Sequence, residues 1–369
     1  MNKQKIQYLI KPSINEIAKY VPGESSIGNN KNVIKLSSNE SPFKIPKNVY
    51  SSIKKLMEKT NLYPDGDSDL LKKSISQRFN LNKSQIICGN GSDDILSIIA
   101  QTFAKENGEV ICNEYGFIYY PIIARAAGAK VVTAKSKNLN IDCENILKKI
   151  SPRTNLIFLA NPNNPTGTII FRDELEQFIA NIPKNVILVL DGAYSEFITD
   201  KQYSDGLDLV KKYPNVIATR TFSKIFALAG LRLGWAYSNK NIIELLEKVR
   251  GPFNVNLIAQ TIGSAILNER NFLKKSIKHN SKWQKKLPEL INKIGLEARE
   301  THTNFVLVKV NKKKFIKKKI IQGLQKKKII VRELLNYGLH DYFRVSIGTD
   351  SQLKKFIKEL KIILKKSRL

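Results

Sequence analysis

Thr221-Phe-Ser-Lys-Ile-Phe-Ala-Leu-Ala-Gly-Leu-Arg-Leu-Gly-Trp235 places a lysine directly after a serine, with an arginine at position 232. Four large apolar residues surround Lys224 in the sequence: Phe222, Ile225, Phe226 and Leu228. An apolar setting lowers the pKa of a lysine, so that its neutral amine can form an imine. Ser223 and Arg232 are a hydroxyl donor and a fixed cation, which together bind a phosphate. A pyridoxal phosphate (PLP) site requires this combination.

Lys224 alone is weak evidence for such a site. The chain has 62 lysines and arginines among 369 residues, and most lysines are solvated surface groups. The interpretation therefore depends on what the rest of the sequence contributes.

Six short apolar runs precede or flank this stretch, separated by segments with helical spacing. They are Gln85–Cys88, Glu109–Cys112, Lys130–Thr133, Asn155–Ala160, Asn185–Leu190 and Asn215–Thr219. Near-continuous apolar strands that alternate with helices indicate an α/β fold with a mainly parallel, buried sheet flanked by helices.

The chain length fits a large domain plus a smaller one. We expect a large cofactor-binding domain at residues 46–269, a smaller α+β domain at 270–369, and an N-terminal segment, 1–45, that packs on the small domain and the active site. Residues 239–269 are expected to be largely helical. The smaller domain is expected to contain strands at 304–310, 329–332 and 343–348 and a helix at 353–364.

The N-terminal residues lack the apolar run of a signal peptide, and no later stretch approaches the length of a membrane span. Three cysteines, Cys88, Cys112 and Cys143, cannot all pair with one another, and they show no CxxC spacing. We therefore expect a cytoplasmic protein in a reducing compartment, with no membrane partner and no metal site.

The formal net charge of +30 raises the possibility of a nucleic-acid partner. The excess is mostly lysine and is densest at 312–319 and 326–328, where apolar residues recur at helical spacing. This pattern is typical of the solvated face of an amphipathic helix. With no nucleic-acid-binding motif in the sequence, we expect no nucleic-acid partner.

Polar residues follow the predicted strands, and ligands of open α/β sheets bind at the carboxyl ends of the strands. Gly89-Asn-Gly-Ser-Asp-Asp94 follows the first strand and opens a helix, so Ser92 and Asp93 could bind an anion at the helix N-terminus. The alternative is a simple capping turn, with Ser92 or Asp93 as N-cap.

Two further strand ends carry candidate groups. Asn161-Pro-Asn-Asn-Pro-Thr-Gly167 predicts a tight loop in which Asn164 could donate to a phenolate oxygen. Asp191 ends a buried strand, where a carboxylate is costly unless it is paired; a protonated pyridine nitrogen is a suitable partner. Tyr194 could reach the O3′ atom of the same ring. The alternative for Asp191 is an ordinary helix N-cap.

Tyr115 in Glu114-Tyr-Gly-Phe117 also follows a strand, and its ring could stack on a planar cofactor. A lone tyrosine at such a position is more often part of the hydrophobic core.

Several strings taken together resemble one family: Asn161-Pro-Asn-Asn-Pro-Thr-Gly167, Asp191-Gly-Ala-Tyr194, Thr221–Arg232, Tyr20-Val-Pro-Gly23, Ser38-Asn-Glu-Ser-Pro42, Tyr63-Pro-Asp65, Gly251-Pro-Phe-Asn-Val-Asn256, Val331-Arg-Glu-Leu334 and Phe343–Thr349. They are similar to the aspartate-aminotransferase-like family of PLP enzymes (fold type I), and within it to the histidinol-phosphate aminotransferases. The similarity extends over nearly the whole chain.

The resemblance implies a role for each matching residue. Lys224 would bind the cofactor aldehyde and then act as general acid and base, and Asp191 would pair with the pyridinium nitrogen. Tyr194 and Asn164 would contact O3′, and Tyr115 would stack on the ring. The phosphate would be held by Ser92, Asp93, Thr221, Ser223 and Arg232.

By the same resemblance, Tyr63 would reach the cofactor phosphate of a neighbouring subunit, which implies a homodimer. Arg332 and Arg344 match the arginines that hold the anionic end of the substrate, with Tyr20 and Asn39 nearby. Arginine rather than lysine at both positions favours bidentate binding of an anion, although both lie in a lysine-rich domain.

Three positions depart from the family pattern. Gly192 stands where the family usually has an acidic residue, Ser41 replaces a common asparagine, and Ser92 replaces a common alanine. None of these changes removes a group that the chemistry requires, but they leave the identity of the amino donor open.

The resemblance implies transamination between histidinol phosphate and 2-oxoglutarate, the reaction of histidine biosynthesis. Related sequences act on aromatic amino acids or on sugar-linked and antibiotic precursors, and one relative decarboxylates threonine phosphate. A different class, a non-catalytic anion-binding protein of high positive charge, would have no use for Lys224, Asp191, Asn164 and Tyr194 together.

Overall fold

Two β-sheets organise the computed structural model, which describes residues 9–28, 33–51 and 53–367. The larger sheet has the strand order β2-β8-β7-β6-β5-β3-β4. Its strands are β2 (Ile86–Gly89), β3 (Glu109–Asn113), β4 (Lys130–Ala134), β5 (Thr154–Ala160), β6 (Ile187–Asp191), β7 (Val216–Thr221) and β8 (Gly234–Tyr237). Strands β4, β3, β5, β6 and β7 are paired in parallel, whereas β8 runs antiparallel to both of its neighbours. The predicted mainly parallel α/β sheet is confirmed.

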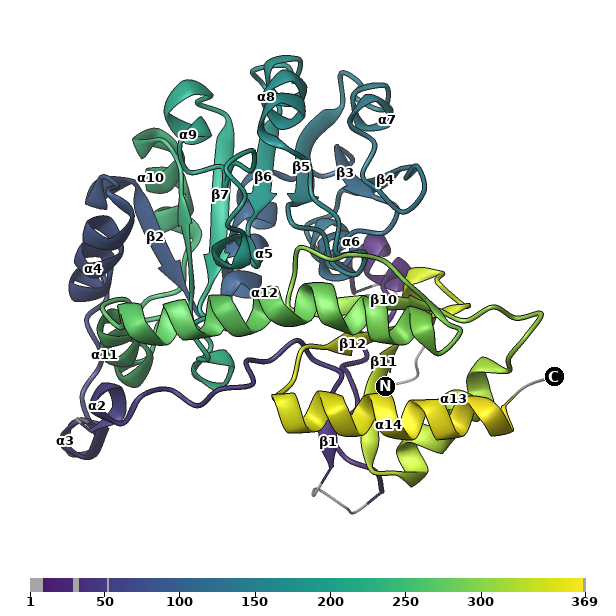
Figure 1. The fold of residues 1–369 in the computed structure, drawn as a ribbon. Coiled ribbons are helices and arrows are strands. Elements are labelled where there is room, and N and C mark those ends of the chain that lie inside the picture. Colours follow the sequence, from purple (N-terminus) through teal and green to yellow (C-terminus); the bar gives the residue numbers. More distant parts are fainter. Residues whose placement is uncertain (1–8, 29–32, 52, 368–369) are drawn as a thin grey trace.

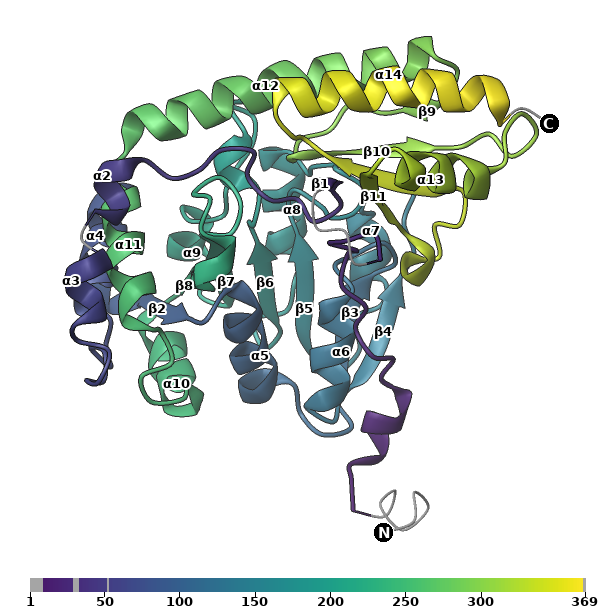
Figure 2. The same cartoon turned by 90° about the horizontal axis from the view of Figure 1, so that it is seen from below.

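Helices cover both faces of this sheet (Figures 1 and 2). The bounds are α2 (Lys47–Tyr50), α3 (Ile53–Met57), α4 (Asp69–Phe79), α5 (Ser92–Phe103), α6 (Tyr119–Ala126), α7 (Cys143–Leu147), α8 (Arg172–Ala180), α9 (Leu209–Lys212), α10 (Lys240–Val249) and α11 (Leu257–Ile266). Strand residues alternate between two cores: Ile157 packs in the cluster with α4, α8 and α11, and Phe158 packs in the cluster with α5, α6 and α10. The apolar runs are near-continuous because both faces of the sheet are buried.

Two strands differ from the expectation. The predicted strand at 130–133 exists as β4, but it lies at the edge of the sheet, with Lys130 and Thr133 exposed rather than buried. Strand β8 was not predicted, since Gly-Trp-Ala-Tyr is short and follows the loop that contains Arg232. It pairs with β2 and β7 and thereby fixes the position of the segment after Lys224.

The smaller sheet has the order β1-β11-β12-β10-β9. Its strands are β1 (Ile34–Leu36), β9 (Glu297–Ala298), β10 (Phe305–Lys309), β11 (Ile329–Glu333) and β12 (Tyr342–Ser346). The N-terminal segment supplies β1, which pairs in parallel with β11. The helices α13 (Lys317–Lys326) and α14 (Asp350–Lys366) bury Ile320, Leu324 and Phe356 against this sheet.

The long helix α12 (Arg270–Lys293) connects the two parts of the molecule (Figure 1). Phe272 and Leu273 near its start belong to the core of the large sheet, whereas Trp283 and Leu287 belong to the core of the small one. The expected boundary between residues 269 and 270 therefore falls at the start of a helix that both cores share.

The N-terminal part of the described chain passes beside α6, where Glu16 forms an ion pair of 3.3 Å with Arg125 (Figure 2). All three cysteines are buried and unpaired. Within the described residues, we find no helix that is both long enough and apolar enough to cross a membrane.

Candidate active site

A cavity of about 490 Å³ opens at the carboxyl ends of the large-sheet strands, between that sheet and the small one. Thirteen of the residues predicted for the site line it: Tyr20, Asn39, Ser92, Asp93, Asn164, Asp191, Tyr194, Thr221, Ser223, Lys224, Arg232, Arg332 and Arg344. The structure thus brings together residues that lie more than 300 positions apart in the sequence. The two candidates outside the lining are Tyr63 and Tyr115.

Lys224 extends into this cavity from the turn that follows β7, and its flanking residues Phe222, Ile225 and Phe226 are fully buried beneath it. Its Nζ atom lies 5.8 Å from the centre of the Tyr194 ring. Burial, followed by the positive charge of Arg344, lowers the pKa of Lys224 to about 8. A lysine with such a pKa is substantially neutral at mildly alkaline pH, as a nucleophilic amine must be.

Asp191 ends β6 and is buried. Its Oδ2 accepts a hydrogen bond of 2.7 Å from the Tyr120 hydroxyl, and its Oδ1 accepts one of 3.2 Å from Thr219 Oγ1. Burial raises the pKa of Asp191, and the hydrogen bonds from Tyr120 and Thr219 act in the opposite direction. Among the described residues no basic side chain forms an ion pair with this carboxylate, so a cationic group bound in the cavity would relieve its desolvation.

Tyr194 and Asn164 each accept one hydrogen bond from another side chain of the protein. The Tyr194 hydroxyl accepts a 3.0 Å hydrogen bond from Asn39 Nδ2, and Asn164 Oδ1 accepts one from Arg344 Nη1. The hydroxyl proton of Tyr194 and the amide N–H₂ of Asn164 therefore remain available as donors. Two such donors suit a phenolate oxygen. Asn39 is held in turn by Ser346, with its backbone N–H at 2.8 Å from Ser346 Oγ.

The turn at residues 89–91, the start of α5 and the loop after Lys224 together form a candidate anion-binding turn. Arg232 lies between the two segments: its Nη2 is 3.1 Å from Asp93 Oδ2, and its Nη1 donates to Ser223 Oγ at 3.3 Å. Gly91, at φ +91°, leaves room for the Arg232 guanidinium, which a Cβ atom at this position would overlap. Ser92 is the first residue of α5. The free backbone N–H groups at this helix N-terminus and the Arg232 cation favour the binding of a phosphate.

Two arginines from the small sheet complete the lining of the cavity. Arg332 and Arg344 are paired directly across β11 and β12. Arg344 is buried over the Phe305 ring, and its Nε is buried without a hydrogen-bond partner in the described chain. Arg332 donates through Nη2 to the carbonyl of Val21 at 2.8 Å. Their neighbouring positive charges create a positive potential suited to an anionic substrate.

Tyr115 does not reach the cavity. Its ring packs against a small cluster that contains Leu307, Leu334 and Leu339, and its carbonyl accepts a hydrogen bond from Asn163 Nδ2. Phe117 and Tyr120 line the cavity instead. Phe117 precedes α6 and Tyr120 lies in its first turn, so no single helical spacing marks the two residues in the sequence.

Tyr63 also lies apart from the cavity. It is 82% exposed, and its ring stacks on Phe253 at 4.6 Å between centroids. Within one chain it contributes nothing to the site.

The packing around position 192 requires a glycine. A Cβ atom there would overlap Nη1 of Arg220 and Oγ of Ser195. Arg220 is fully buried and pairs with Glu196 and Asp205 at 3.4 and 3.3 Å. Its guanidinium fills the space that a larger residue 192 would need. No contact in the structure explains the serine at position 41.

We expect Tyr120→Phe to lower the turnover number by about 10- to 100-fold, the effect of losing a hydrogen bond to a charged group. The ring would keep its stacking on Phe158, which lies at 5.0 Å with nearly parallel planes, so only the contact with Asp191 is removed. Steady-state kinetics would measure the effect. Tyr119→Phe is the matched control, because the Tyr119 hydroxyl contacts Ser97 rather than Asp191. An equal loss in both variants would contradict the prediction.

The donor set fits PLP. The cavity holds an amine of lowered pKa, a buried carboxylate for a cationic ring nitrogen, two donors for a phenolate oxygen and a helix N-terminus with an arginine for a phosphate. In the described part of the chain, no group of three or more His, Cys, Asp or Glu residues is placed to hold a metal ion.

Comparisons with known proteins show the family. The family described as "Aminotransferase class I and II" matches residues 31–360. The histidinol-phosphate aminotransferase of Pelagibacter ubique is 40% identical over 94% of this chain and 97% of its own length. That of Rhodopseudomonas palustris (strain BisB18) is 40% identical over 92% of this chain and 93% of its own.

Solved structures share the fold. The histidinol-phosphate aminotransferase of Sinorhizobium meliloti, in complex with pyridoxal-5′-phosphate, has a TM-score of 0.87 at 24% identity and covers 97% of this chain and 98% of its own. That of Clostridium acetobutylicum has a TM-score of 0.83 at 28% identity and covers 90% of this chain and 100% of its own.

Proposed function

The chain belongs to the aminotransferase class I and II family, and we propose that it catalyses the transamination of histidinol phosphate with 2-oxoglutarate in histidine biosynthesis. It is a PLP-dependent transferase. The observation that carries this conclusion is the placement of Lys224, whose pKa is lowered, in one cavity with the buried carboxylate of Asp191 and the Arg232 anion site.

When bound, PLP supplies an aldehyde that accepts the amino group and a ring that stores the electron pair released at the substrate carbon. We assign the remaining tasks to residues of this chain. Lys224 Nζ would hold the cofactor aldehyde and would move a proton at the substrate carbon as a neutral amine, the form that its lowered pKa favours at mildly alkaline pH. Asp191, held by Tyr120 and Thr219, would keep the ring nitrogen of the cofactor protonated.

The substrate assignment rests on the relatives and on the charge of the site. Histidinol phosphate and 2-oxoglutarate both carry an anionic group at one end, and Arg332 and Arg344 are the cations that we assign to it, with Tyr20 and Asn39 beside them. Arg344 has an unpaired buried Nε, and a bound anion would satisfy it.

A half-reaction tests the substrate. The cofactor-loaded enzyme is mixed with L-histidinol phosphate in the absence of a keto acid, and the visible absorbance of the bound cofactor is followed. We expect the visible band to fall and a near-ultraviolet band to rise at low substrate concentration. Bleaching by phenylalanine or tyrosine alone would identify an aromatic aminotransferase. Release of CO₂ from threonine phosphate would identify a decarboxylase.

We also propose that the enzyme works as a homodimer. The region that contains α3, α4 and the turn between them exposes several large apolar side chains: Met57 at 53%, Leu62 at 62%, Tyr63 at 82% and Leu70 at 59%. An apolar surface of this kind favours association with a second copy. Tyr63 would then reach the cofactor phosphate of the partner subunit. The unpaired thiols fit a reducing compartment, the cytoplasm.

Tyr63→Phe should weaken PLP binding by about tenfold, the loss of roughly one hydrogen bond to an anion. The ring would still stack on Phe253, so we expect the dimer itself to persist. Titration of the cofactor-free protein with PLP measures the affinity, and sedimentation measures the assembly. A monomeric wild-type enzyme with full activity would refute the role of Tyr63.

A further inference from the structure

The segment Gly251-Pro-Phe-Asn-Val-Asn256 has no role in the site described above, although it lies between α10 and α11. Asn254 in this segment donates through Nδ2 to two acceptors: Asp94 Oδ2 at 3.0 Å and the Cys88 carbonyl at 3.2 Å. The two acceptors flank the turn at residues 89–91, with Cys88 in β2 before it and Asp94 in α5 after it. Asn254 therefore links the α10–α11 loop to the two residues that flank the turn at residues 89–91.

Asp94 connects this contact to the backbone of the turn. The same oxygen, Oδ2, accepts a 2.8 Å hydrogen bond from the backbone N–H of Asn90. Asn90 stands between Gly89 and Gly91, and glycine residues leave a turn conformationally free unless other groups restrain it. Asp94 supplies that restraint, and Asn254 holds the side chain of Asp94 in place.

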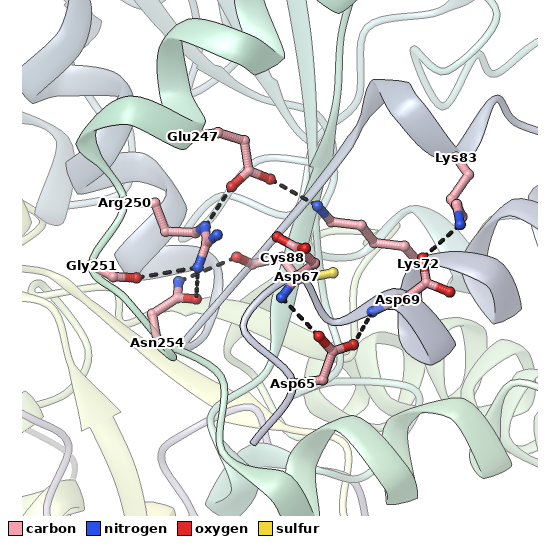
Figure 3. A network of polar contacts seen from close by, with 10 residues as sticks. All are labelled: Asp65, Asp67, Asp69, Lys72, Lys83, Cys88, Glu247, Arg250, Gly251 and Asn254. Carbon is pink, nitrogen blue, oxygen red and sulfur yellow. Dashed lines mark hydrogen bonds and ion pairs between the residues drawn. The ribbon is translucent and has the colours of Figure 1, made fainter. Parts of the chain in front are cut away.

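A chain of charged groups fixes the orientation of Asn254 (Figure 3). Arg250 Nη1 donates to Asn254 Oδ1 at 3.2 Å, and Glu247 binds Arg250 Nε through one oxygen and Lys72 Nζ, at 2.8 Å, through the other. Arg250 can only donate and Asp94 can only accept, so the amide can adopt one orientation. The side chains of Lys72 and Arg250 are 15% and 13% exposed, so solvent screens this chain of contacts less than a surface pair.

We propose that Asn254 is a positioning residue for the cofactor phosphate, acting through Asp94 on the turn at residues 89–91. Asn254 does not line the cavity. It sets the positions of the backbone N–H groups at the start of α5, and a phosphate bound there depends on their preorganisation. The proposal rests on the proposed function, since it takes PLP as the ligand of this turn.

The test separates the phosphate from the rest of the cofactor. Cofactor-free wild-type and Asn254→Ala proteins are titrated with PLP and with pyridoxal, which lacks the phosphate. We expect Asn254→Ala to weaken PLP binding about tenfold, about 1.4 kcal/mol, and to leave pyridoxal binding within about twofold. An equal loss for both ligands would overturn the proposal, because it would indicate general damage to the site.

Asn239→Ala is a matched control. Asn239 caps the N-terminus of α10 through its side chain and donates to the Pro214 carbonyl, at the end of the helix opposite to Arg250. Its loss should lower the melting temperature without changing the ratio of PLP to pyridoxal affinity. A changed ratio in this variant would show that destabilisation alone produces the effect, and would overturn the proposal.

A double-mutant cycle tests the route through Asp94. If Asn254 acts by holding Asp94, then Asp94→Ala alone should produce the full phosphate-specific loss, and Asn254→Ala should add nothing to it. Additive losses would overturn the assignment. If the wild-type protein binds neither PLP nor pyridoxal, the proposed function fails instead, and that outcome is distinct from either result above.

Discussion

Replacing Lys224 with alanine is expected to abolish transamination, with a loss of at least about 10⁴-fold in turnover. The variant loses both the amine that binds the cofactor and the group that moves the proton. The fold should persist, because the apolar neighbours of Lys224 remain in the core. Steady-state kinetics with histidinol phosphate and the visible spectrum of the purified protein measure the two losses.

Lys184→Ala is the control, since Lys184 is an exposed lysine outside the cavity. Residual activity of Lys224→Ala above one-hundredth of wild type would contradict the assignment. Partial recovery on addition of a small primary amine would support it, because an external base can then replace the missing group.

The lowered pKa of Lys224 also predicts how cofactor binding and stability of the wild-type protein depend on pH. Only the neutral amine attacks an aldehyde, so the rate at which the cofactor-free wild-type protein takes up PLP covalently should rise with pH and reach half its maximum near pH 8. The same shift affects stability: between the folded pKa and the ordinary value of 10.5 the unfolded chain binds more protons, so stability rises with pH in that window. Lys224→Ala should lack this rise.

Much of the large domain could be predicted because its strands are buried on both faces. Ile157 and Phe158 illustrate this: neighbouring positions face opposite cores, so both must be apolar, and the run is visible in one sequence. Strand β8 lacks such a signal. Its four residues acquire their place by pairing with the preceding strand β7 and with β2, and β2 is distant in the sequence.

The site was predictable to the extent that strand ends determine it. Asp191 ends β6, and Asn164 and Lys224 lie in the loops that follow β5 and β7, so the parallel sheet brings the three together. Tyr115 shows the limit of this argument. Gly116 N–H bonds to the Asn113 carbonyl at 2.9 Å, and the turn so formed places Tyr115 on one side and Phe117 on the other. A sequence pattern does not specify which side faces the cavity.

The departure at position 192 could not be interpreted from the sequence for a related reason. Asp191 is paired with Thr219 across β6 and β7, which brings Arg220 beside Gly192. The requirement for glycine arises from this pairing between strands.

The lysine-rich segment at 312–319 differs from the predicted amphipathic helix at its start, since α13 begins only at Lys317.

Asp191→Asn is expected to lower turnover by about 10²- to 10³-fold, the effect of removing one partner of a buried charge pair at about 3–5 kcal/mol. The amide keeps the shape of the side chain and can still accept from Tyr120. It carries no charge, however, so it does not favour a protonated ring nitrogen. The affinity for histidinol phosphate should change little, because Arg332 and Arg344 are unaltered. A large increase in KM with unchanged kcat would contradict the role of Asp191.

The same substitution should stabilise the cofactor-free protein. Burial raises the pKa of Asp191 above the ordinary 3.8. Between 3.8 and the folded pKa the folded state therefore binds more protons than the unfolded state. Stability falls as the pH rises through this window, because the buried carboxylate becomes charged. The neutral amide of the Asp191→Asn variant would carry no such cost, so the variant's advantage in melting temperature should be larger at pH 7 than at pH 4. PLP supplies a cation to the wild-type carboxylate. Saturation with PLP should therefore narrow or reverse the difference in melting temperature between the variant and the wild type. An advantage that is equal at both pH values would show that the buried charge is not its cause.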